Sequence, residues 1–591
     1  MLIYSRLRFL FKNKVLSLQQ KSIEETTIMK KTLFLLTTAM IYALMAGAQV
    51  NTTEPADPNP GDSSCWTTLT AMKAGWGTID ERYSKSAIPT FAKAPVLHGW
   101  RGERLNAQAL IVTPSEVVSA SLTASDLKSG RKVIPATAIK PYFVRYVIGD
   151  TYQDHTATTY YPDRLGNSAT LAIEANTTRP VWIEVSIPRD AAAGTYKGTL
   201  TINCDGTTFK LPYTVEVVNR TLPEPKEWAF HLDLWQNPYA VARYYEVPLW
   251  SKEHFDLMRP LMTELANAGQ KVITTSIIRH PWNSQTYDPF ESMIGKYKAL
   301  DGSWSYDYTV FDQWVEFMMS CGIDEQIDCY TLVPWGYKFD YYDVASHSIK
   351  EIACEPGTPA YEDLIFPFLK DFAAHLKAKG WFARTCIAMD ERPMKQLQAA
   401  REVVRRADPG YRLKGAVNYS PEVVDLMYDI SITFRHGELP EGVVEDRQAN
   451  NQLTTFYTCC NPERPNTFTF SPLPESAFLG WHAAAIGVDG YLRWAYCSWP
   501  PQPCQDTRYG KGWSSGDTFL HYPGQPSIRW QRLVEGIQQY EKIRLLRPSL
   551  TKKQSALLDK ALAPMGKTSY DADTDFAALI ATARQTLRSI E

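Results

Sequence analysis

The sequence lacks several features that would place it in a common class of protein. Its 591 residues carry a formal net charge of only -2, so nothing indicates a polyanionic partner and we expect no nucleic acid ligand. The ten cysteines include no C-x-x-C pair, and the histidines and cysteines form no cluster with metal-ligand spacing. We therefore predict no metal site and no cofactor.

Ten cysteines in a chain of this length are also too few for a disulfide scaffold. Most are predicted to be buried thiols, and Cys386 lies in a predicted core strand. Cys497 and Cys504 are candidates for a bridge within one loop.

No run after residue 48 is long and apolar enough to span a bilayer, so we predict no integral membrane segment. An export signal is present instead. Met29-Lys30-Lys31 precedes an apolar run, Thr32 to Met45, and Ala46-Gly47-Ala48 has the small-x-small cleavage pattern. We predict cleavage near Ala48 and export to the periplasm or the cell surface, with residues 1–28 as a non-native upstream extension.

Aromatic residues are abundant, with 17 Trp, 32 Tyr and 23 Phe. Trp and Tyr combine a flat apolar face with a polar edge, which suits the alternating CH faces and hydroxyl groups of sugars. A Trp-rich core accounts for part of this number, so composition alone does not decide between packing and sugar binding.

The chain divides into four parts after residue 48. Residues 49–62 are polar and Pro-rich and predict a linker. Residues 63–222 contain short β-branched or alternating runs separated by turn signals, which predict a β-sandwich. Residues 225–546 alternate between strand and helix patterns, and residues 547–591 predict C-terminal helices.

The third part contains eight strand–helix units, the number in a (β/α)8 TIM-like barrel. The predicted strands are Trp228–Trp235, Lys271–Ile278, Ile327–Val333, Cys386–Met389, Leu413–Asn418, Ile430–Phe434, Thr454–Thr458 and Gly490–Tyr496. The predicted helices are His254–Ala268, Val310–Cys321, Tyr361–Lys379, Lys395–Ala407, Pro474–Ile486 and Ser527–Leu545.

Two adjacent carboxylates, Asp390 and Glu391, stand where the fourth predicted strand ends. Barrel enzymes present their catalytic groups at the carboxyl ends of the strands, so this pair is the candidate catalytic pair. The alternative is that the two acids only begin a loop and cap the following helix.

Other polar and aromatic residues also follow predicted strands. Because the strand ends converge on one rim, we predict that these residues bind substrate. They are Trp335, Asn418, Tyr457, Trp494, Trp499, Asp517 and Tyr522.

Paired carboxylates suit glycoside hydrolysis, but adjacent residues do not easily stand on opposite sides of one bond. They suit substrate-assisted hydrolysis better, in which a 2-acetamido group attacks its own anomeric carbon. In that scheme Glu391 is the general acid/base, and Asp390 accepts the amide N–H and stabilises the positive charge.

The chain resembles glycoside hydrolase family 123, the β-N-acetylgalactosaminidases. The resemblance covers about residues 225–545 and is carried by MDERP (389–393), YDYTVFDQWVEFMMSCGI (306–323), HLKAKGW (375–381), DGYLRWAY (489–496) and HYPG (521–524). It implies a retaining, substrate-assisted exo-enzyme for glycans with terminal β-linked GalNAc, including those of glycosphingolipids. The family's paired acids correspond to Asp390 and Glu391.

Three alternatives remain open at this point. The first is a β-N-acetylglucosaminidase of the same mechanism, because the acid pair reads the acetamido group and not the C4 hydroxyl. The second is a non-catalytic glycan-binding protein on an inherited barrel, and the third is a structural surface protein whose aromatic residues form the core. Oligomeric state is not predicted.

Overall fold

The computed structural model describes residues 51–591 apart from 62, 284, 435–438 and 511. The predicted upstream extension, the signal sequence and the first two residues of the linker lie outside the described residues. Within the described part of the chain, no helix is both long enough and apolar enough to cross a membrane.

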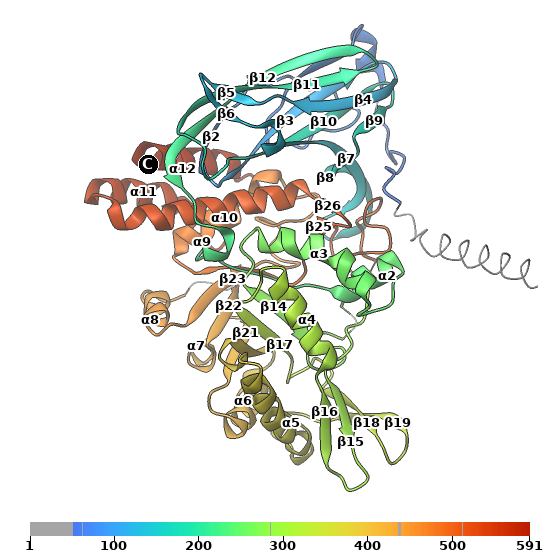
Figure 1. Cartoon of the computed structure of the whole chain (residues 1–591), viewed down its shortest axis with the longest axis vertical. Helices are drawn as coiled ribbons and strands as arrows, with labels where there is room; N and C mark the ends of the chain where they lie inside the picture. Colours follow the sequence, from blue (N-terminus) through green and yellow to red (C-terminus); the bar gives the residue numbers. More distant parts are fainter. Residues whose placement is uncertain (1–50, 62, 284, 435–438, 511) are drawn as a thin grey trace, which may run out of the picture. The chain divides into compact units, whose positions relative to one another are not determined.

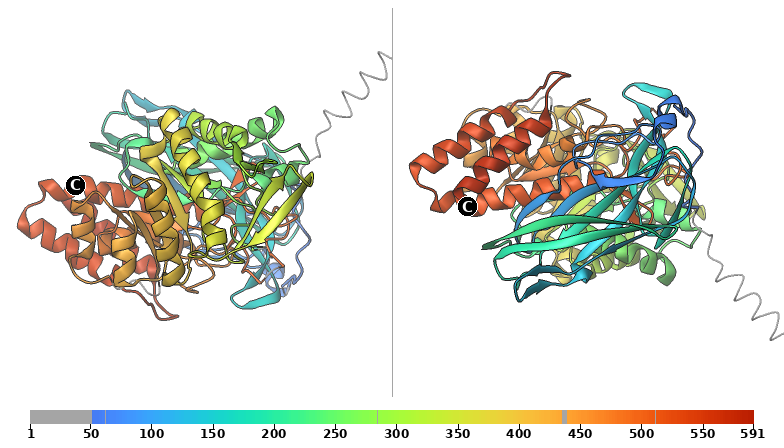
Figure 2. Two further views of the ribbon diagram at one scale, coloured as in Figure 1. Left: turned by 90° about the horizontal axis from the view of Figure 1, so that it is seen from below. Right: turned by 90° about the horizontal axis from the view of Figure 1, so that it is seen from above.

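The N-terminal domain consists of two sheets packed face to face, drawn in blue to green in Figures 1 and 2. Its strands are β1 (Lys73–Trp76), β2 (Val96–Arg101), β3 (Arg104–Thr113), β4 (Val117–Ala124), β5 (Leu127–Ser129), β6 (Lys132–Ile134), β7 (Ile139–Thr151), β8 (Asp154–Gly166), β9 (Thr170–Ile173), β10 (Thr177–Ser186), β11 (Gly194–Cys204) and β12 (Thr207–Thr221). One sheet has the order β1-β3-β10-β7-β8 and the other β2-β12-β11-β4-β9, with β5 attached to β11 and β6 to β5. Ile111 and Val181 of the first sheet share one buried cluster with Ile202 and Val215 of the second, which confirms the predicted β-sandwich.

Residues 51–61, before the sandwich, have no regular structure, but they are held firmly at Glu54. The Glu54 carboxylate accepts two hydrogen bonds from Arg179, at 2.6 and 2.9 Å, and one from Arg145 at 2.9 Å. Burial acts to raise the pKa of Glu54, but the charges and hydrogen bonds of the two arginines outweigh burial and lower the pKa to about 2. This stretch of the predicted linker is therefore part of the sandwich.

The second domain is a barrel of eight parallel strands, all of them predicted. They are β13 (His231–Leu234), β14 (Val272–Ser276), β17 (Gln326–Tyr330), β20 (Thr385–Met389), β21 (Arg412–Val417), β22 (Asp429–Thr433), β23 (Leu453–Tyr457) and β24 (Gly490–Arg493). Neighbours in the sheet follow the order of the chain, β13 also pairs with β24, and a single bridge from Leu232 to Gln270 joins β13 to the start of β14. The (β/α)8 prediction is thus confirmed as a nearly closed barrel.

Helices connect these strands on the outside of the barrel (Figure 1). The predicted ones are present as α3 (Lys252–Ala266), α4 (Thr309–Ser320), α5 (Pro359–Ala378), α6 (Met394–Ala407), α9 (Leu473–Ile486) and α10 (Ile528–Leu546). The prediction missed α2 (Pro238–Tyr245), α7 (Pro421–Leu426) and α8 (Val443–Ala449), which are too short to show a helical period. The expected C-terminal helices are α11 (Lys552–Leu562) and α12 (Phe576–Ile590).

Two hairpins form a small sheet that the sequence did not predict. It has the order β16-β15-β18-β19 and contains β15 (Gly295–Lys298), β16 (Trp304–Asp307), β18 (Lys338–Asp343) and β19 (Ser348–Ala353). The hairpins follow β14 and β17, so they rise from the carboxyl ends of barrel strands two and three. Figure 1 shows them together in the lower part of the view.

A buried cluster of charges ties the strands together inside the barrel. The ammonium group of Lys414, on β21, forms ion pairs with Asp233 of β13, Asp328 of β17 at 2.5 Å and Asp429 of β22 at 3.4 Å. The side chains are at most 1% exposed. Gln326 donates to both Asp328 and Asp429, at 2.9 and 2.8 Å. One cation therefore compensates carboxylates from three other strands.

Replacing Lys414 by Met should destabilise the protein strongly, because the carboxylates remain buried without their cation. Removing one partner of a buried ion pair costs about 3–5 kcal/mol. The matched control is Lys252→Met on α3: Lys252 also pairs with an aspartate, Asp256, but its side chain is 89% exposed. That change should cost less than about 1 kcal/mol. Urea and thermal unfolding midpoints measure both effects, and equal midpoints for the two variants would contradict the prediction.

Candidate active site

The candidate acids lie at the carboxyl end of the barrel, directly after β20. All five residues of β20 are buried, which fixes the end of the strand. Asp390 is half-buried and Glu391 is exposed. The backbone N–H of Arg392 donates to the carbonyl of Asp390 at 2.6 Å, and α6 starts at Met394. Since neither acid side chain accepts a helix-capping hydrogen bond at the start of α6, capping does not explain the pair.

Asp390 is held by an aromatic residue from the neighbouring strand. The indole N–H of Trp335, which follows β17, donates to Asp390 Oδ2 at 3.1 Å. The Arg392 guanidinium lies 4.8 Å from the ring centre of Trp335 and packs over its face. Burial raises the pKa of Asp390 to about 6; the Glu391 carboxylate adds to the rise, and the hydrogen bond from Trp335 opposes it.

Glu391 is held from a different part of the barrel. The Tyr457 hydroxyl, on the last residue of β23, donates to Glu391 Oε1. In the sheet, β23 is separated from β20 by β21 and β22, so this bond spans part of the barrel mouth. The two adjacent acids therefore have different donors and different exposure.

Aromatic side chains form a cluster at this end of the barrel. Trp235 follows β13, Trp282 follows β14, and Tyr330 ends β17; their ring centres are 4.5–5.0 Å apart. Tyr457, Trp494 and Cys459 belong to or pack against the same cluster. Within the described residues, the indole N–H groups of Trp235 and Trp282 and the Tyr330 hydroxyl are buried without a hydrogen-bond partner. Donors left in this way are rare in folded proteins.

The sequence analysis missed Trp235, Trp282 and Tyr330 as site residues. A signal was present for two of them, because Trp235 ended the first predicted strand and Tyr330 lay within the third. Trp282 comes from the loop after β14, where no strand end marks it.

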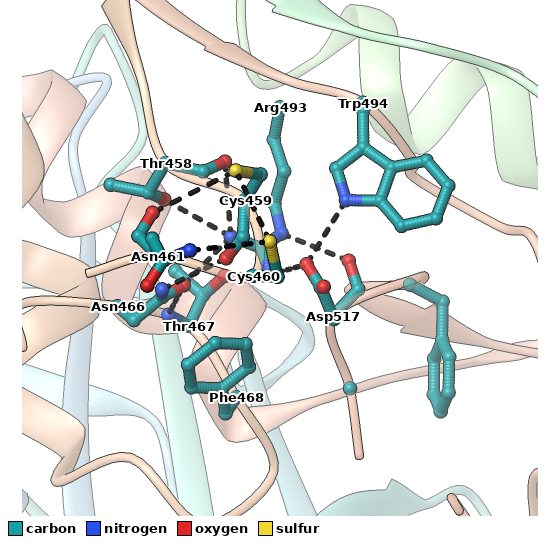
Figure 3. A network of polar contacts seen from close by, with 12 residues as sticks. Thr458, Cys459, Cys460, Asn461, Asn466, Thr467, Phe468, Arg493, Trp494 and Asp517 are labelled. Atoms are coloured by element: carbon teal, nitrogen blue, oxygen red, sulfur yellow. Dashed lines mark hydrogen bonds and ion pairs between the residues drawn. The ribbon is translucent and has the colours of Figure 1, made fainter. Parts of the chain in front are cut away.

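Asp517 and Trp494, two predicted substrate-binding residues, are joined in a polar network beside this cluster (Figure 3). Asp517 Oδ1 accepts from the indole N–H of Trp494 at 3.0 Å and from Arg493 at 2.8 Å. Arg493 also donates to Asn466 at 2.8 Å and to the Thr458 hydroxyl at 3.0 Å. Burial raises the pKa of Asp517, and the charge of Arg493 opposes the rise. The network fixes the loop residue Asp517 against the ends of β23 and β24.

The other predicted substrate-binding residues lie in different surroundings. Asn418 follows β21, next to β20, and its side chain is exposed. Trp499 is buried, and its indole N–H donates to the carbonyl of His521 at 2.7 Å. Tyr522 is buried against the sandwich, where its hydroxyl donates to Asp163 of β8 at 2.7 Å. Asp163 also pairs with Arg529 of α10 at 3.0 Å, so Tyr522 is part of the contact between sandwich and barrel.

Cys497 and Cys504 are both free thiols, so the candidate bridge between these two is not formed. Cys497 Sγ accepts from the backbone N–H of Asn237, and Cys504 Sγ from the Tyr244 hydroxyl. Across the described ranges, no group of three or more His, Cys, Asp or Glu side chains is arranged to hold a metal ion.

Comparison with solved structures gives a match of high similarity. A family 123 glycoside hydrolase from Clostridium perfringens, described in a study of glycolipid glycan hydrolysis, has a TM-score of 0.81 and 27% identity. The match covers 88% of this chain and 97% of that one. A putative α-galactosidase/melibiase from Bacteroides fragilis covers 76% of this chain and 78% of its own, but with a TM-score of 0.24 and 11% identity it supports no inference. Comparison with curated proteins gives no match.

Two family models match the chain in the order of its domains. Residues 76–204 match the glycoside hydrolase 123 N-terminal domain, and residues 235–546 match the glycoside hydrolase 123 catalytic domain. The second match contains the barrel strands from β14 to β24, the acid pair and the aromatic cluster at the mouth, and it covers more than half of the chain. The protein is therefore a glycoside hydrolase and belongs to glycoside hydrolase family 123.

Proposed function

We propose that this enzyme is an exo-acting, retaining β-N-acetylgalactosaminidase that releases terminal β-linked GalNAc with the help of the substrate's own acetamido group. The observation that carries the proposal is the pair Asp390–Glu391 at the barrel mouth, with Trp335 on one acid and Tyr457 on the other. The C. perfringens relative, whose study concerns glycolipid glycans, makes glycosphingolipid glycans the natural substrates to test.

The proposed reaction has two steps. In the first, the acetamido carbonyl oxygen attacks the anomeric carbon while Glu391 gives its proton to the departing glycosidic oxygen. This forms a cyclic oxazolinium-like intermediate. In the second, Glu391 takes a proton from water, which attacks the same carbon and opens the ring. Because both displacements invert that carbon, the product retains the β configuration.

The different surroundings of the two acids support these roles. Glu391 is exposed and so can exchange its proton with solvent between the two steps. Asp390 is half-buried beside an indole donor, a place suited to accepting the acetamido N–H and offsetting positive charge in the transition state. Such a hydrogen bond would itself favour the ionised form of Asp390.

The unpaired donors of the mouth support a sugar ligand. Trp235, Trp282 and Tyr330 each hold a buried N–H or O–H without a partner among the described residues, and sugar hydroxyl oxygens would accept from them.

The second candidate is a β-N-acetylglucosaminidase with the same mechanism. In the proposed mechanism Asp390 and Glu391 interact with the acetamido group and the glycosidic oxygen, which GlcNAc and GalNAc share. A direct comparison of the two sugars decides between the candidates.

A panel of aryl β-glycosides of GalNAc, GlcNAc, galactose and glucose should show hydrolysis that requires the 2-acetamido group. We expect β-GalNAc to be cleaved with retention and β-galactoside to be cleaved hardly at all. NMR identification of the first-formed anomer measures retention. Preference for β-GlcNAc would select the second candidate. Comparable turnover of the plain galactoside would contradict substrate assistance.

Substituting the two acids should give defects of different kinds. Glu391→Gln should lower kcat by about 10²–10⁴ for a poor leaving group, the usual loss when general acid/base catalysis is removed, and by less for a good one. Asp390→Asn should be impaired for good and poor leaving groups alike, because charge stabilisation is lost. The control is Glu402→Gln on α6, an exposed acid that should leave kcat unchanged.

Values of kcat/KM across aryl glycosides of graded leaving-group pKa measure this difference. A steeper leaving-group dependence for Asp390→Asn than for Glu391→Gln would show that the two roles are reversed.

The acid limb of the pH profile should report the ionisation of Asp390. Since the pKa of Asp390 is raised to about 6, kcat/KM should fall as the pH drops below about 6 and the carboxylate takes up a proton. Trp335→Phe removes a hydrogen bond that favours the carboxylate, so the limb should move to higher pH by about one unit. Trp304→Phe, on the small sheet, should leave the limb in place. A limb that stays unchanged or moves to lower pH in Trp335→Phe would contradict this assignment.

A further inference from the structure

Two adjacent cysteines lie at the barrel mouth, and the proposed mechanism does not use them. Cys459 and Cys460 come two and three residues after Tyr457, the residue whose hydroxyl contacts Glu391. Their sulfur atoms are 3.8 Å apart, and both side chains are half-buried. Of the other eight cysteines, Cys65 is exposed and seven are buried, and none of these eight is adjacent to another in the chain.

The backbone around this pair is held in place by the network of Figure 3. The Cys459 N–H donates to the Asn461 carbonyl at 3.0 Å, and its own carbonyl accepts from the Asn466 side chain at 3.0 Å. Asn466 in turn accepts from the buried Arg493 at 2.8 Å. The turn therefore keeps the two thiols together and accessible from the mouth.

The two thiols are not equivalent. Cys460 Sγ accepts a hydrogen bond from the Asn461 side-chain amide at 3.5 Å and contacts the thiol of Cys459. The hydrogen bond from Cys459 lowers the pKa of the Cys460 thiol, and burial and the carboxylates of Asp517 and Glu391 oppose that shift. A thiolate is the reactive form of cysteine, so Cys460 is the expected nucleophile of the pair.

We propose that Cys459 and Cys460 form a reversibly oxidised vicinal dithiol, a modification site that reacts with small organic disulfides and lies beside the acid pair. The Cys460 thiolate attacks one sulfur of the organic disulfide RSSR, forms a mixed disulfide and releases one RS⁻. Cys459 Sγ, losing its proton to solvent, then attacks Cys460 Sγ and releases the second RS⁻. The two cysteines are oxidised to one disulfide, and RSSR is reduced to two RSH.

The geometry favours a labile bond over a permanent one. The sulfurs must approach from 3.8 Å to about 2.05 Å. Adjacent residues have Cα atoms only about 3.8 Å apart, below the usual separation across a disulfide, so the ring is strained. Strained disulfides have more oxidising potentials and are reduced readily.

Oxidation of Cys459 and Cys460 should also affect the acid pair. Closing the ring turns the peptide between Cys459 and Cys460, and Tyr457 lies two residues before it on the same strand end. We expect the bond from Tyr457 to Glu391 to be disturbed in the oxidised form and kcat to fall about threefold to tenfold, the effect of weakening one hydrogen bond to a charged group.

The experiment uses the full-length enzyme, reduced and then incubated with 2-hydroxyethyl disulfide. Alkylation followed by tryptic mass spectrometry measures the oxidation state of Cys459 and Cys460 directly, because residues 448–493 form one peptide with no other cysteine. We expect that peptide to lose two hydrogens and take up no alkyl label, and to regain two labels after dithiothreitol. The trivalent arsenical phenylarsine oxide, which bridges two thiols, should bind the reduced enzyme and protect the same peptide.

Variants separate this pair from the other thiols. Cys459→Ser should stop at the mixed disulfide on Cys460, and Cys460→Ser should react at least about tenfold more slowly; neither should bind the arsenical. Cys65→Ser should behave as the wild type. For each enzyme, the kcat of the oxidised form is divided by the kcat of its own reduced form. A change in the basal rate of a variant therefore does not affect this ratio.

Two results would overturn the proposal. One is a wild-type peptide that stays fully alkylated after treatment with the disulfide. The other is a wild-type peptide that accumulates only the mixed disulfide. An intramolecular disulfide with no change in kcat would confirm the modification site and refute its link to Tyr457.

Discussion

The barrel depends on one buried cation, Lys414. Burying a carboxylate is costly unless an opposite charge accompanies it, and three carboxylates from β13, β17 and β22 converge on this ammonium group. The strand that carries the acid pair, β20, lies between β17 and β21 and so between two strands that the cluster joins. Strand order, the position of β20 and hence the position of Asp390 and Glu391 therefore rest on this buried interaction. The charges that hold the barrel together are thus different residues from the candidate catalytic acids.

Asp390 and Glu391 are adjacent in the chain, but the elements packed around them give them different properties. Side chains that follow one another at the end of an extended strand point in different directions. Asp390 meets an indole from the neighbouring strand, whereas Glu391 meets a phenol from β23. A single dipeptide can thus supply one half-buried carboxylate and one exposed carboxylate.

The sequence predicted the barrel well because each strand is a short apolar run bounded by turn signals, and because eight such runs alternate with helices. It also located Asp390, Glu391 and Tyr457 near one rim. It could not predict that Trp335 donates to Asp390, or that Tyr522 contacts Asp163, because such contacts join residues far apart in the chain. Trp494, Trp499 and Tyr522 follow the same strand, and the polar atoms of all three bond within the protein. Position after a strand therefore does not separate packing residues from exposed ones. The small sheet was missed because β15 and β16 are only four residues long.

The attachment of Glu54 bears on how the sandwich can be divided or shortened. The region that matches the N-terminal family domain begins at residue 76, well after this glutamate. A protein cut at that boundary would keep Arg179, which is 2% exposed, and lose the carboxylate that accompanies it. An unpaired guanidinium buried in a β-sandwich costs several kcal/mol, so the excised domain would be less stable for a reason outside its own borders. The part of the chain that stabilises this domain is therefore longer than the segment by which the family is recognised, and it extends to a residue in a stretch with no secondary structure.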